Sequence, residues 1–250
     1  MKQCFIRSIL QILPGLAGVL LWQTIVYGVP RYEFFVGSPL GIIREFGVLW
    51  KEENLPIHAM VTTLEAILGF IAGCSIGTVV GLAMWGSQRA YEVSRPYLIA
   101  LGSVPVFAFG PVLIFWFGTG MWSKIVLGFL STFVIAVVQA HTGASEADAN
   151  LLRVVKAFGG TQRQAFFKII VPSATIWVLS GIRLNIGMAL LGAFIGEFIS
   201  SRMGLGHLII VAEGLYNVNQ IWVGTICIVA IAILFHASTI PIERWAKRWQ

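Results

Sequence analysis

The chain has 250 residues, of which 57% are apolar and 11% are charged. Soluble domains carry about 25% charged residues, so this composition excludes a disordered chain, a nucleic-acid-binding arm and an ordinary soluble enzyme. It predicts an all-α membrane protein. The net charge of +6 is then expected to reflect how basic residues divide between the two sides of the bilayer rather than nucleic-acid binding.

Six apolar stretches are long enough to cross a bilayer core, which requires about 20 helical residues. They lie at about residues 9–29, 59–85, 97–118, 123–142, 171–197 and 217–241. The first is too long for the apolar region of a signal peptide, and no small-residue cleavage site follows it, so we expect a retained helix. Residues 1–250 are therefore expected to form a single transmembrane domain.

The basic residues predict the orientation of these spans. An even number of spans places both termini on one side of the membrane. With cytoplasmic termini, eleven basic residues lie in the cytoplasm and five lie outside. Because basic residues favour the cytoplasmic side, we expect a multi-pass plasma-membrane protein with both termini in the cytoplasm.

The outer loop between the first two spans is expected to hold one surface helix. Ser38 can cap this helix, and Pro39 suits its first turn. Four apolar residues recur at helical spacing, which predicts a position in the membrane interface: Leu40, Ile43, Phe46 and Trp50.

Glycine recurs at every fourth position of the second predicted span, at Gly69, Gly73, Gly77 and Gly81. Residues four apart lie on the same side of a helix. The four glycines therefore form a ridge that a neighbouring backbone can approach closely. Helix packing is favoured over a role in a substrate path.

The third predicted span contains Pro105 and Pro111. A proline costs about 3 kcal/mol in a helix interior, and the freed backbone groups need new partners in lipid. Two interpretations stay open. The segment is either a broken helix that lines the translocation path, with Ser103 as a polar contact, or a kinked helix.

Glu65 and Arg183 are the two ionisable residues that fall well inside predicted spans. A charge at this depth is a functional candidate by default. The two side chains are expected to pair or to line one polar cavity, and Glu65 alternatively reaches the outer interface.

No motif for a metal or a nucleotide is found. The histidines His58, His141, His207 and His236 show no ligand spacing. The three cysteines are too dispersed for a disulfide framework or a metal site. Without a G-x-x-x-x-G-K-[ST] sequence, the chain is not expected to bind ATP as P-loop proteins do.

The loop between the fourth and fifth predicted spans, residues 145–170, reads as two helices separated by glycines. Ser145-Glu146-Ala147-Asp148 has the form of a capping box, and Thr161-Gln162-Arg163-Gln164 has the form of a second one. Gly159-Gly160 is expected to end the first helix. That helix has an apolar face, composed of Leu151, Leu152, Val155 and Phe158.

Two partners suit an amphipathic helix in the cytoplasm. A sharp glycine end favours docking into the groove of another protein. The alternative is a helix that lies flat on anionic membrane lipid. In either case four basic residues are expected on the cytoplasmic surface: Arg153, Lys156, Arg163 and Lys168.

Several short motifs follow one another along the chain. Residues 148–187 contain Asp-x-x-Leu-Leu, Lys-Ala-Phe-Gly, Val-Pro and Ser-Gly-Ile-Arg-Leu. Outside this run lie four further motifs: Ser38-Pro39, Val104-Pro105, residues 117–124, and Glu197 ahead of Gly204-Leu205-Gly206. Together they resemble inner-membrane permeases of ATP-binding cassette importers, whose "EAA" loop matches residues 148–187. The resemblance is greatest to the nitrate/sulfonate/taurine type, and it covers nearly the whole chain from about residue 35.

This resemblance implies a type I importer permease fold with a cytoplasmic coupling helix. It implies a homodimer of permeases, two ATPase subunits that bind ATP and Mg²⁺, and an extracytoplasmic substrate-binding protein. No covalent chemistry and no cofactor are implied for this chain. The residues expected to dock onto the ATPase are Leu152, Val155, Lys156, Ala157, Phe158, Gly159, Gly160 and Gln164.

The implied substrate is a small solute, such as the anions nitrate, sulfonate, taurine or bicarbonate, although similar permeases also handle vitamins and their precursors. The translocation path is expected to include Ser103, Pro105, Glu65 and Arg183. The sequence departs from the family pattern at two places. Arg153-Val154-Val155 replaces the Glu-Ala-Ala motif, and Glu65 stands where similar permeases usually carry arginine.

A self-contained secondary transporter is the alternative function. The absence of an inverted repeat and the scarcity of acids inside the spans argue against it.

Overall fold

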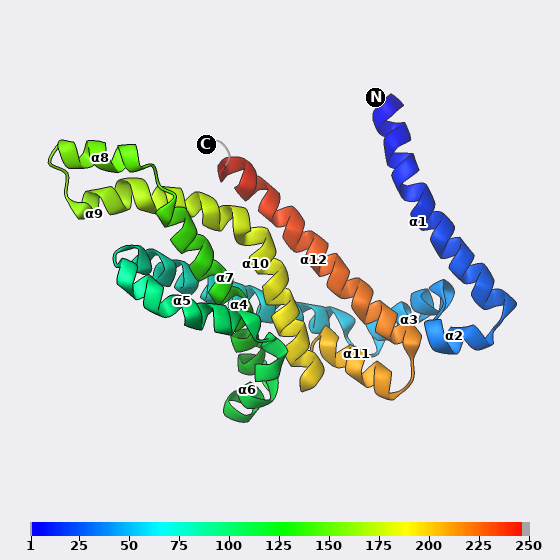
Figure 1. The fold of residues 1–250 in the computed structure, drawn as a ribbon. Helices are drawn as coiled ribbons and strands as arrows, with labels where there is room; N and C mark the ends of the chain where they lie inside the picture. Colours follow the sequence, from blue (N-terminus) through cyan, green and yellow to red (C-terminus); the bar gives the residue numbers. More distant parts are fainter. Residues whose placement is uncertain (1, 247–250) are drawn as a thin grey trace.

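Figure 1 shows the computed structural model, which describes the backbone of residues 2–246 and the side chains of residues 13–241. Every regular element in this part of the chain is helical. The two termini and α8 (Ala149–Ala157) lie toward one end of the molecule, here called the terminal end. Helices α6 (Gly110–Phe117) and α11 (Leu205–Gly214) lie at the opposite, distal end.

Three long helices form the centre of the fold: α4 (Leu55–Trp85), α7 (Met121–Ser145) and α10 (Val171–Ile199). Helix α7 packs against both of the others. Small side chains fill these contacts, including the buried Ala136 and Ala189. In a membrane, helices gain little from burying large apolar side chains, so small residues that let backbones approach favour association.

The predicted glycine ridge forms the α4 side of this contact, which confirms the helix-packing interpretation. All four glycines are buried against α7. A Cβ atom at Gly69 would lie 2.9 Å from the Cα atom of Gly128. A Cβ atom at Gly77 would lie 2.6 Å from the carbonyl oxygen of Phe133. We call this contact, from Gly69 to Gly81, the glycine seam.

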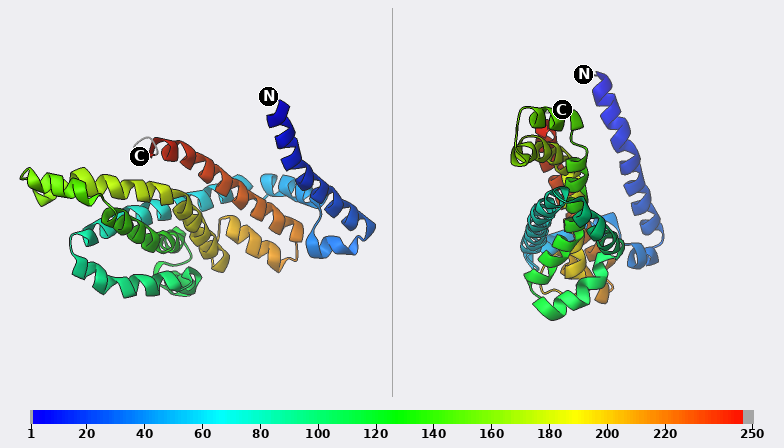
Figure 2. Two further views of the ribbon diagram at one scale, coloured as in Figure 1. Left: turned by 45° about the horizontal axis from the view of Figure 1, so that its top comes forward. Right: turned by 60° about the vertical axis from the view of Figure 1, so that its left-hand side comes forward.

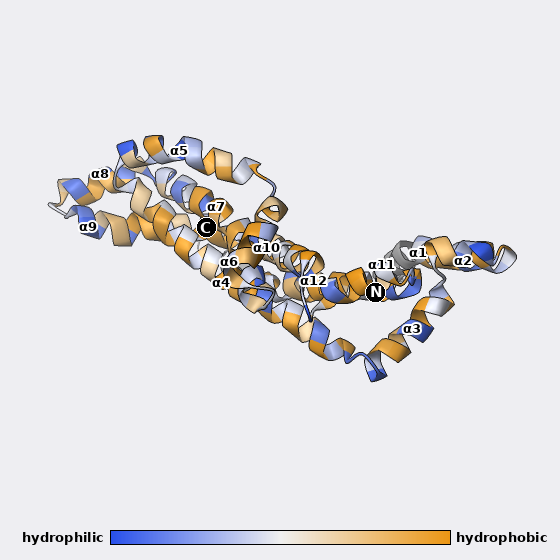
Figure 3. Cartoon of the chain, turned by 90° about the horizontal axis from the view of Figure 1, so that it is seen from below, coloured by the Kyte–Doolittle hydropathy of each residue, from blue (hydrophilic) through white to orange (hydrophobic). Residues whose placement is uncertain are grey.

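Helix α12 (Val218–Ala246) packs on α10, α11 and α3 (Pro39–Lys51). A buried apolar cluster joins these helices with the start of α4, and its larger members are Leu49, Leu55, Leu190, Leu205, Leu208, Val223 and Ile231. Figure 3 shows hydrophobic residues along the long helices and hydrophilic residues around α8 and α9 (Gln162–Ala165).

Helix α1 (Lys2–Gly28) stands apart from the other long helices in Figures 1 and 2. It joins the rest of the molecule at its distal end, through α2 (Arg31–Val36) and α3. There the rings of Trp22 and Trp222 lie 5.4 Å apart, and the Trp22 indole donates a hydrogen bond to the Gly37 carbonyl oxygen at 3.2 Å.

The predicted surface helix is α3, and its predicted cap is confirmed. The amide of Gly41 donates a hydrogen bond to the Ser38 hydroxyl oxygen at 2.9 Å, and Pro39 stands in the first turn. The four apolar residues expected on one face, Leu40, Ile43, Phe46 and Trp50, are all exposed. This exposure fits a helix in the membrane interface.

The third predicted span is not a single helix. Helix α5 (Gln88–Ser103) is followed by the 3₁₀ turn η1 (Val106–Phe109) and α6, and the two parts are bent by 88°. Pro105 precedes η1 and Pro111 stands in the first turn of α6, so each proline begins a new helix. The segment is therefore broken and not merely kinked, and its role in the translocation path stays a prediction.

Four helical segments of the described residues are long and apolar enough to cross a membrane: α4, α7, residues 162–199 and residues 218–241. The bent α5–α6 segment would be a fifth. Of the first predicted span, the part with described side chains, Leu13–Gly28, is a shorter apolar helix, so the count of six spans stays a prediction. Neither α2 nor α11 is predicted from the sequence, and α11 is too short to be recognised as a span.

Candidate functional site

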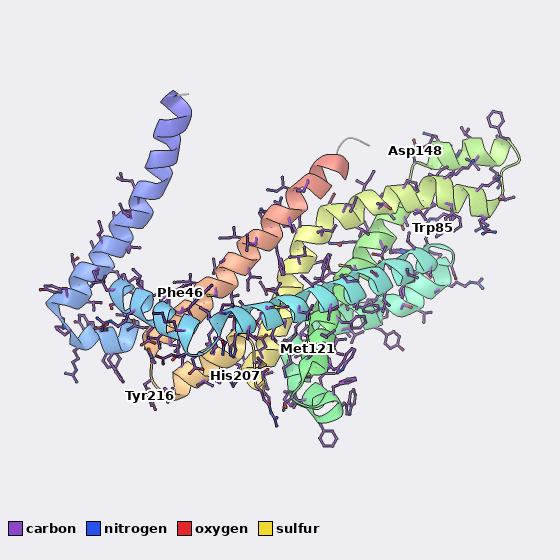
Figure 4. All side chains as sticks on the ribbon, turned by 180° about the vertical axis from the view of Figure 1, so that it is seen from behind. Phe46, Trp85, Met121, Asp148, His207 and Tyr216 are labelled. Carbon is purple, nitrogen blue, oxygen red and sulfur yellow. The ribbon has the colours of Figure 1, made fainter. Side chains whose placement is uncertain are left out.

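A helical hairpin projects from the terminal end of the bundle and occupies the loop predicted at residues 145–170. It consists of α8 and α9, and a five-residue π-helix, η2 (Phe166–Ile170), leads from α9 directly into α10. Figure 4 places Asp148, at the start of this hairpin, near Trp85 at the end of α4. We call residues 148–165 the terminal hairpin.

The first predicted capping box of the terminal hairpin is wrong. Ser145 is the last residue of α7, and the helix expected to begin at Glu146 begins at Ala149. Asp148 is the N-cap, and its carboxylate accepts a hydrogen bond from the Asn150 amide at 2.7 Å. The apolar periodicity of α7 continues beyond the expected boundary, so Ser145 is drawn into that helix.

The glycine break is confirmed at the end of α8. Gly159 has φ of +73°, in the left-handed region that favours glycine. The Gly160 amide donates to the Val155 carbonyl oxygen at 2.8 Å, and the Gly159 amide donates to that of Lys156 at 3.1 Å. This pair of hydrogen bonds is a Schellman motif, which satisfies the last carbonyl groups of the helix and fixes the direction of the chain.

The second predicted capping box is confirmed at the start of α9. The Gln164 amide donates to the Thr161 hydroxyl at 3.3 Å, and the Thr161 amide donates to the Gln164 side chain at 2.8 Å. Gln164, which was expected to dock onto the ATPase, therefore has a local structural role in which its side-chain oxygen is already engaged.

The exposed apolar side chains of the terminal hairpin match the predicted face only in part. Phe158 is 88% exposed, Leu151 is 51% exposed and Val154 is 50% exposed. Leu152 and Val155 are half-buried, and Leu152 packs on a cluster at the ends of α7 and α10. Leu152 thus holds the hairpin against its own bundle, Val155 lies next to Gly160 within the hairpin, and Phe158 is left uncovered. Ala157 and the basic residues Arg153, Lys156, Arg163 and Lys168 are exposed, as predicted for the four basic residues.

Arg183 is exposed in the middle of α10, on the same side of the helix as Ser180 and Gly187. The opposite side is buried, where the Asn185 amide donates to the Gln139 side-chain oxygen at 2.9 Å. Because a charge facing lipid at this depth is costly, the exposed side of α10 suits a polar path or a protein partner. Ser103 is also exposed, and its hydroxyl donates to the Ile99 carbonyl oxygen within α5 at 2.7 Å.

Glu65 does not pair with Arg183. Its side chain is 1% exposed and lies against Glu197, near the distal end of α10. Arg183 lies fourteen residues earlier in that helix, or about 21 Å along its axis. The expected pairing is therefore wrong, and so is the expectation that Glu65 extends to the membrane surface.

Glu65 belongs to a buried polar cluster that the sequence does not predict. It brings together Glu65 of α4, Lys124 of α7 and Glu197 of α10, and the latter two are 0% exposed. The Lys124 ammonium donates to the carbonyl oxygens of Thr119 and Ser200, both at 2.6 Å. We call Glu65, Lys124 and Glu197 the distal cluster.

The distal cluster also fixes the start of α11. Glu197 accepts a hydrogen bond from the Gly206 amide at 2.7 Å, and Thr62 accepts one from the Leu205 amide at 2.8 Å. Gly204 has φ of +109° and packs directly against the Glu197 carboxylate. Only glycine suits this position, because a Cβ atom would occupy the space of the carboxylate.

Two histidines stack beside the distal cluster. The rings of His58 and His207 lie 6.1 Å apart and nearly parallel, and the Gly204 amide donates to Nδ1 of His58 at 3.0 Å. Burial lowers the pKa of His207, and the neighbouring His58 acts in the same direction. The residues that the structure describes contain no group of three or more metal-ligating side chains.

A domain that crosses the bilayer several times, with a broken segment and a structured hairpin beyond its spans, is built as the membrane component of a transporter. Residues 67–248 match the family described as binding-protein-dependent transport system inner membrane component. The chain therefore belongs to this family of ATP-binding cassette importer permeases and is a multi-pass inner-membrane protein. This confirms the resemblance drawn from the sequence.

The relatives differ in what their names say they transport. Over 213 residues the chain is 30% identical to a putative aliphatic sulfonates transport permease of Bacillus subtilis, covering 85% of this chain and 77% of that protein. Over 238 residues it is 26% identical to a riboflavin transport system permease of Chloroflexus aurantiacus, covering 93% of this chain and 87% of that protein.

The fold is also similar to a solved structure. A chain of the methionine ABC transporter, in an inward-facing conformation, matches with a TM-score of 0.69 at 16% identity, covering 78% of this chain and 99% of that chain. The likeness confirms the predicted type I importer permease fold.

Proposed function

We propose that two copies of this chain form the translocation pathway of an ATP-driven importer for a small solute. Two ATPase subunits, which bind ATP and Mg²⁺, dock at the terminal end, and a substrate-binding protein delivers the solute at the distal end. The terminal end, with both termini, then faces the cytoplasm. The family described as binding-protein-dependent supports this assignment of partners.

The observation that carries the proposal is the terminal hairpin. Both of its helices are capped and its glycine turn is fixed by two hydrogen bonds, so it has a defined shape. Phe158 nevertheless stays almost fully exposed. An aromatic side chain presented on a defined helical scaffold is typical of an anchor that a partner buries.

The proposed mechanism is mechanical. ATP binding closes the ATPase pair and displaces the terminal hairpin, which is seated in a groove of the ATPase. Because η2 joins the hairpin to α10 without a loop, the displacement passes to the spans. The two permeases then alternate between inward-facing and outward-facing cavities by rigid-body motion.

The substrate is proposed to be a small solute that carries an anionic group, such as nitrate, a sulfonate, taurine or bicarbonate. The exposed Arg183 in the middle of α10 supplies a positive charge at the depth where a solute crosses, with Ser103 and the turn at Pro105 on the neighbouring segment. The name of the Bacillus subtilis relative supports a sulfonate. Glu65, which is buried in the distal cluster, is assigned to the closure of the distal end and not to direct contact with the solute.

The test is reconstitution of the chain with its ATPase and its binding protein in sealed vesicles. We expect uptake of labelled solute that requires ATP and persists when ionophores dissipate the ion gradients. Uptake that needs a gradient and proceeds without ATP would contradict the proposal and favour a secondary transporter. Reporters fused at Gly160 and Lys51 check the orientation, and we expect them in the cytoplasm and outside, respectively.

A further inference from the structure

A cavity of about 470 Å³ lies beside the distal cluster. Its walls come from α4, from the residues before and at the start of α7, and from the loop after α10, and they include Val61, Glu65, Thr119, Met121, Ser201 and Arg202. Figure 4 shows Met121 at the distal end. The cavity has room for several waters or for a large polar side chain.

The distal cluster is incompletely compensated. It contains two carboxyl groups and one ammonium group, and the ammonium already donates to two loop carbonyl oxygens at 2.6 Å. Among the described residues, Oε2 of Glu65 and Oε1 of Glu197 accept no hydrogen bond. The Glu65 and Glu197 side chains share a hydrogen bond, but these two oxygens stay without a donor, and a buried carboxyl oxygen without a partner is costly. The cluster therefore has a place for one further donor.

Arg202 fits that requirement. It is exposed and lines the same cavity as Glu65, and none of the hydrogen bonds or ion pairs of the described residues involves it. The short loop that carries it is fixed at both ends: Lys124 binds the Ser200 carbonyl oxygen at 2.6 Å, and Gly204 packs against Glu197. A guanidinium is weakly hydrated and binds carboxylates in a bidentate fashion, which suits a buried ion pair.

We propose that Arg202 swings into the cavity and pairs with Glu65, and that this movement closes the distal end of the bundle during the transport cycle. The inference rests on the proposed function, because a cycle supplies the two states. With Arg202 in place, the distal cluster has equal numbers of acids and cations, and the cavity is filled by protein. In the structure described here, Arg202 is in its open position.

The first test measures access to the cavity. Val61→Cys is introduced into the complete complex after the three native cysteines have been replaced by serine, and it is labelled from outside with a membrane-impermeant maleimide. We expect the labelling rate to differ between the nucleotide-free and vanadate-trapped states, on the order of tenfold. The difference should disappear in Arg202→Gln and in Glu65→Gln. Arg44→Gln, at another exposed distal-end arginine, is the matched control and should preserve it.

The second test asks whether the two residues act as a pair. Arg202→Gln and Glu65→Gln should each lower uptake about tenfold, and the double variant should be no worse than either, because both changes break one interaction. Arg202→Lys should restore part of the uptake. Size-exclusion chromatography of each complex shows whether the variant has folded.

Equal labelling rates in the two states with Arg202 present would overturn the inference, and so would additive losses in the double variant. Labelling that is unchanged by Arg202→Gln but altered by external cations would show instead that an ion occupies the cavity. Failure of the proposed function is distinguishable, because the unmodified complex would then show no ATP-dependent uptake at all.

Discussion

Glycine is essential in two regions of this molecule for opposite reasons. In the glycine seam, the backbone is an ordinary helix and the space is missing, because α7 lies where a side chain would be. In the terminal hairpin, space is plentiful around Gly159, where a Cβ atom would meet nothing within 4 Å, but the backbone is left-handed. The seam thus determines whether the bundle assembles, while the hairpin determines which surface it presents.

The largest effect is expected from filling the seam. Gly77→Leu places a side chain against the Phe133 carbonyl oxygen, which can move only if α4 and α7 separate. Overpacking usually costs about 1–3 kcal/mol of stability. Here the obstacle is the backbone of α7, which can shift less than a side chain to remove the clash, so we expect loss of folded protein. Size-exclusion chromatography and thermal unfolding measure it. Gly187→Leu in α10, where a Cβ atom meets nothing within 4 Å, is the control and should fold normally.

A substitution in the terminal hairpin should impair coupling to the ATPase and leave the folding of the bundle unchanged. Gly159→Val puts a β-branched residue at φ of +73°, which costs about 1–2 kcal/mol or more and redirects the end of α8. We expect normal membrane levels, weak co-purification with the ATPase and uptake near background. Gly118→Val is the matched control, because Gly118 has φ of +75° in open space at the distal end. It should retain the ATPase. Full ATPase binding and uptake by Gly159→Val would favour a hairpin that rests on lipid.

A third test concerns α10, which packs against α7 and is joined to the terminal hairpin through η2. Arg183→Leu should leave the amount of folded complex unchanged, since the side chain lies on the exposed side of the helix. Uptake should fall on the order of tenfold, equal to about 1.4 kcal/mol, and Arg183→Lys should retain more activity because it keeps the charge. Uptake at the unmodified rate by Arg183→Leu would remove this residue from the path.

The smallest effects should distinguish the two faces of α8. Phe158→Ala removes the exposed anchor, and we expect the ATPase affinity to fall by about 1–2 kcal/mol with no change in unfolding temperature. Leu152→Ala removes a half-buried contact with the bundle and should instead lower the stability of the hairpin, by about 1 kcal/mol. Titration of the ATPase and thermal unfolding measure the two quantities. Equal effects of both variants on affinity would place both residues in the interface.

Local signals in the sequence predict much of this fold. The cap at Ser38, the capping box at Thr161 and the turn at Gly159 each depend on residues within five positions, and the structure confirms all three. The spacing of the seam glycines likewise predicts a tight neighbour. Helix α7 could not be named as that neighbour, because nothing in the α4 sequence specifies which helix approaches.

The incorrect predictions concern side chains whose surroundings come from distant parts of the sequence. Lys124 lies at the outer end of the fourth predicted span, so its charge is expected at the outer surface. It is buried because two loop carbonyl oxygens and two acids converge on it from distant parts of the chain. The same convergence places Glu65 beside Glu197 rather than Arg183. On α8, helical spacing identifies apolar residues but does not tell which of them turn toward α7 and α10.

The join between the terminal hairpin and α10 has a consequence for how force travels. Helical backbone runs without a loop from Gln162 to Ile199. A displacement of the hairpin would therefore be transmitted to the membrane-spanning part of α10 without first extending a flexible loop. Any compliance along this connection must reside in the π-helical residues, Phe166–Ile170, whose wider turn is the one departure from α-helical geometry there. Under the proposed mechanism, these five residues would set the stiffness of the transmission, and the displacement would reach first the part of α10 that carries Arg183 and then the part that carries Glu197.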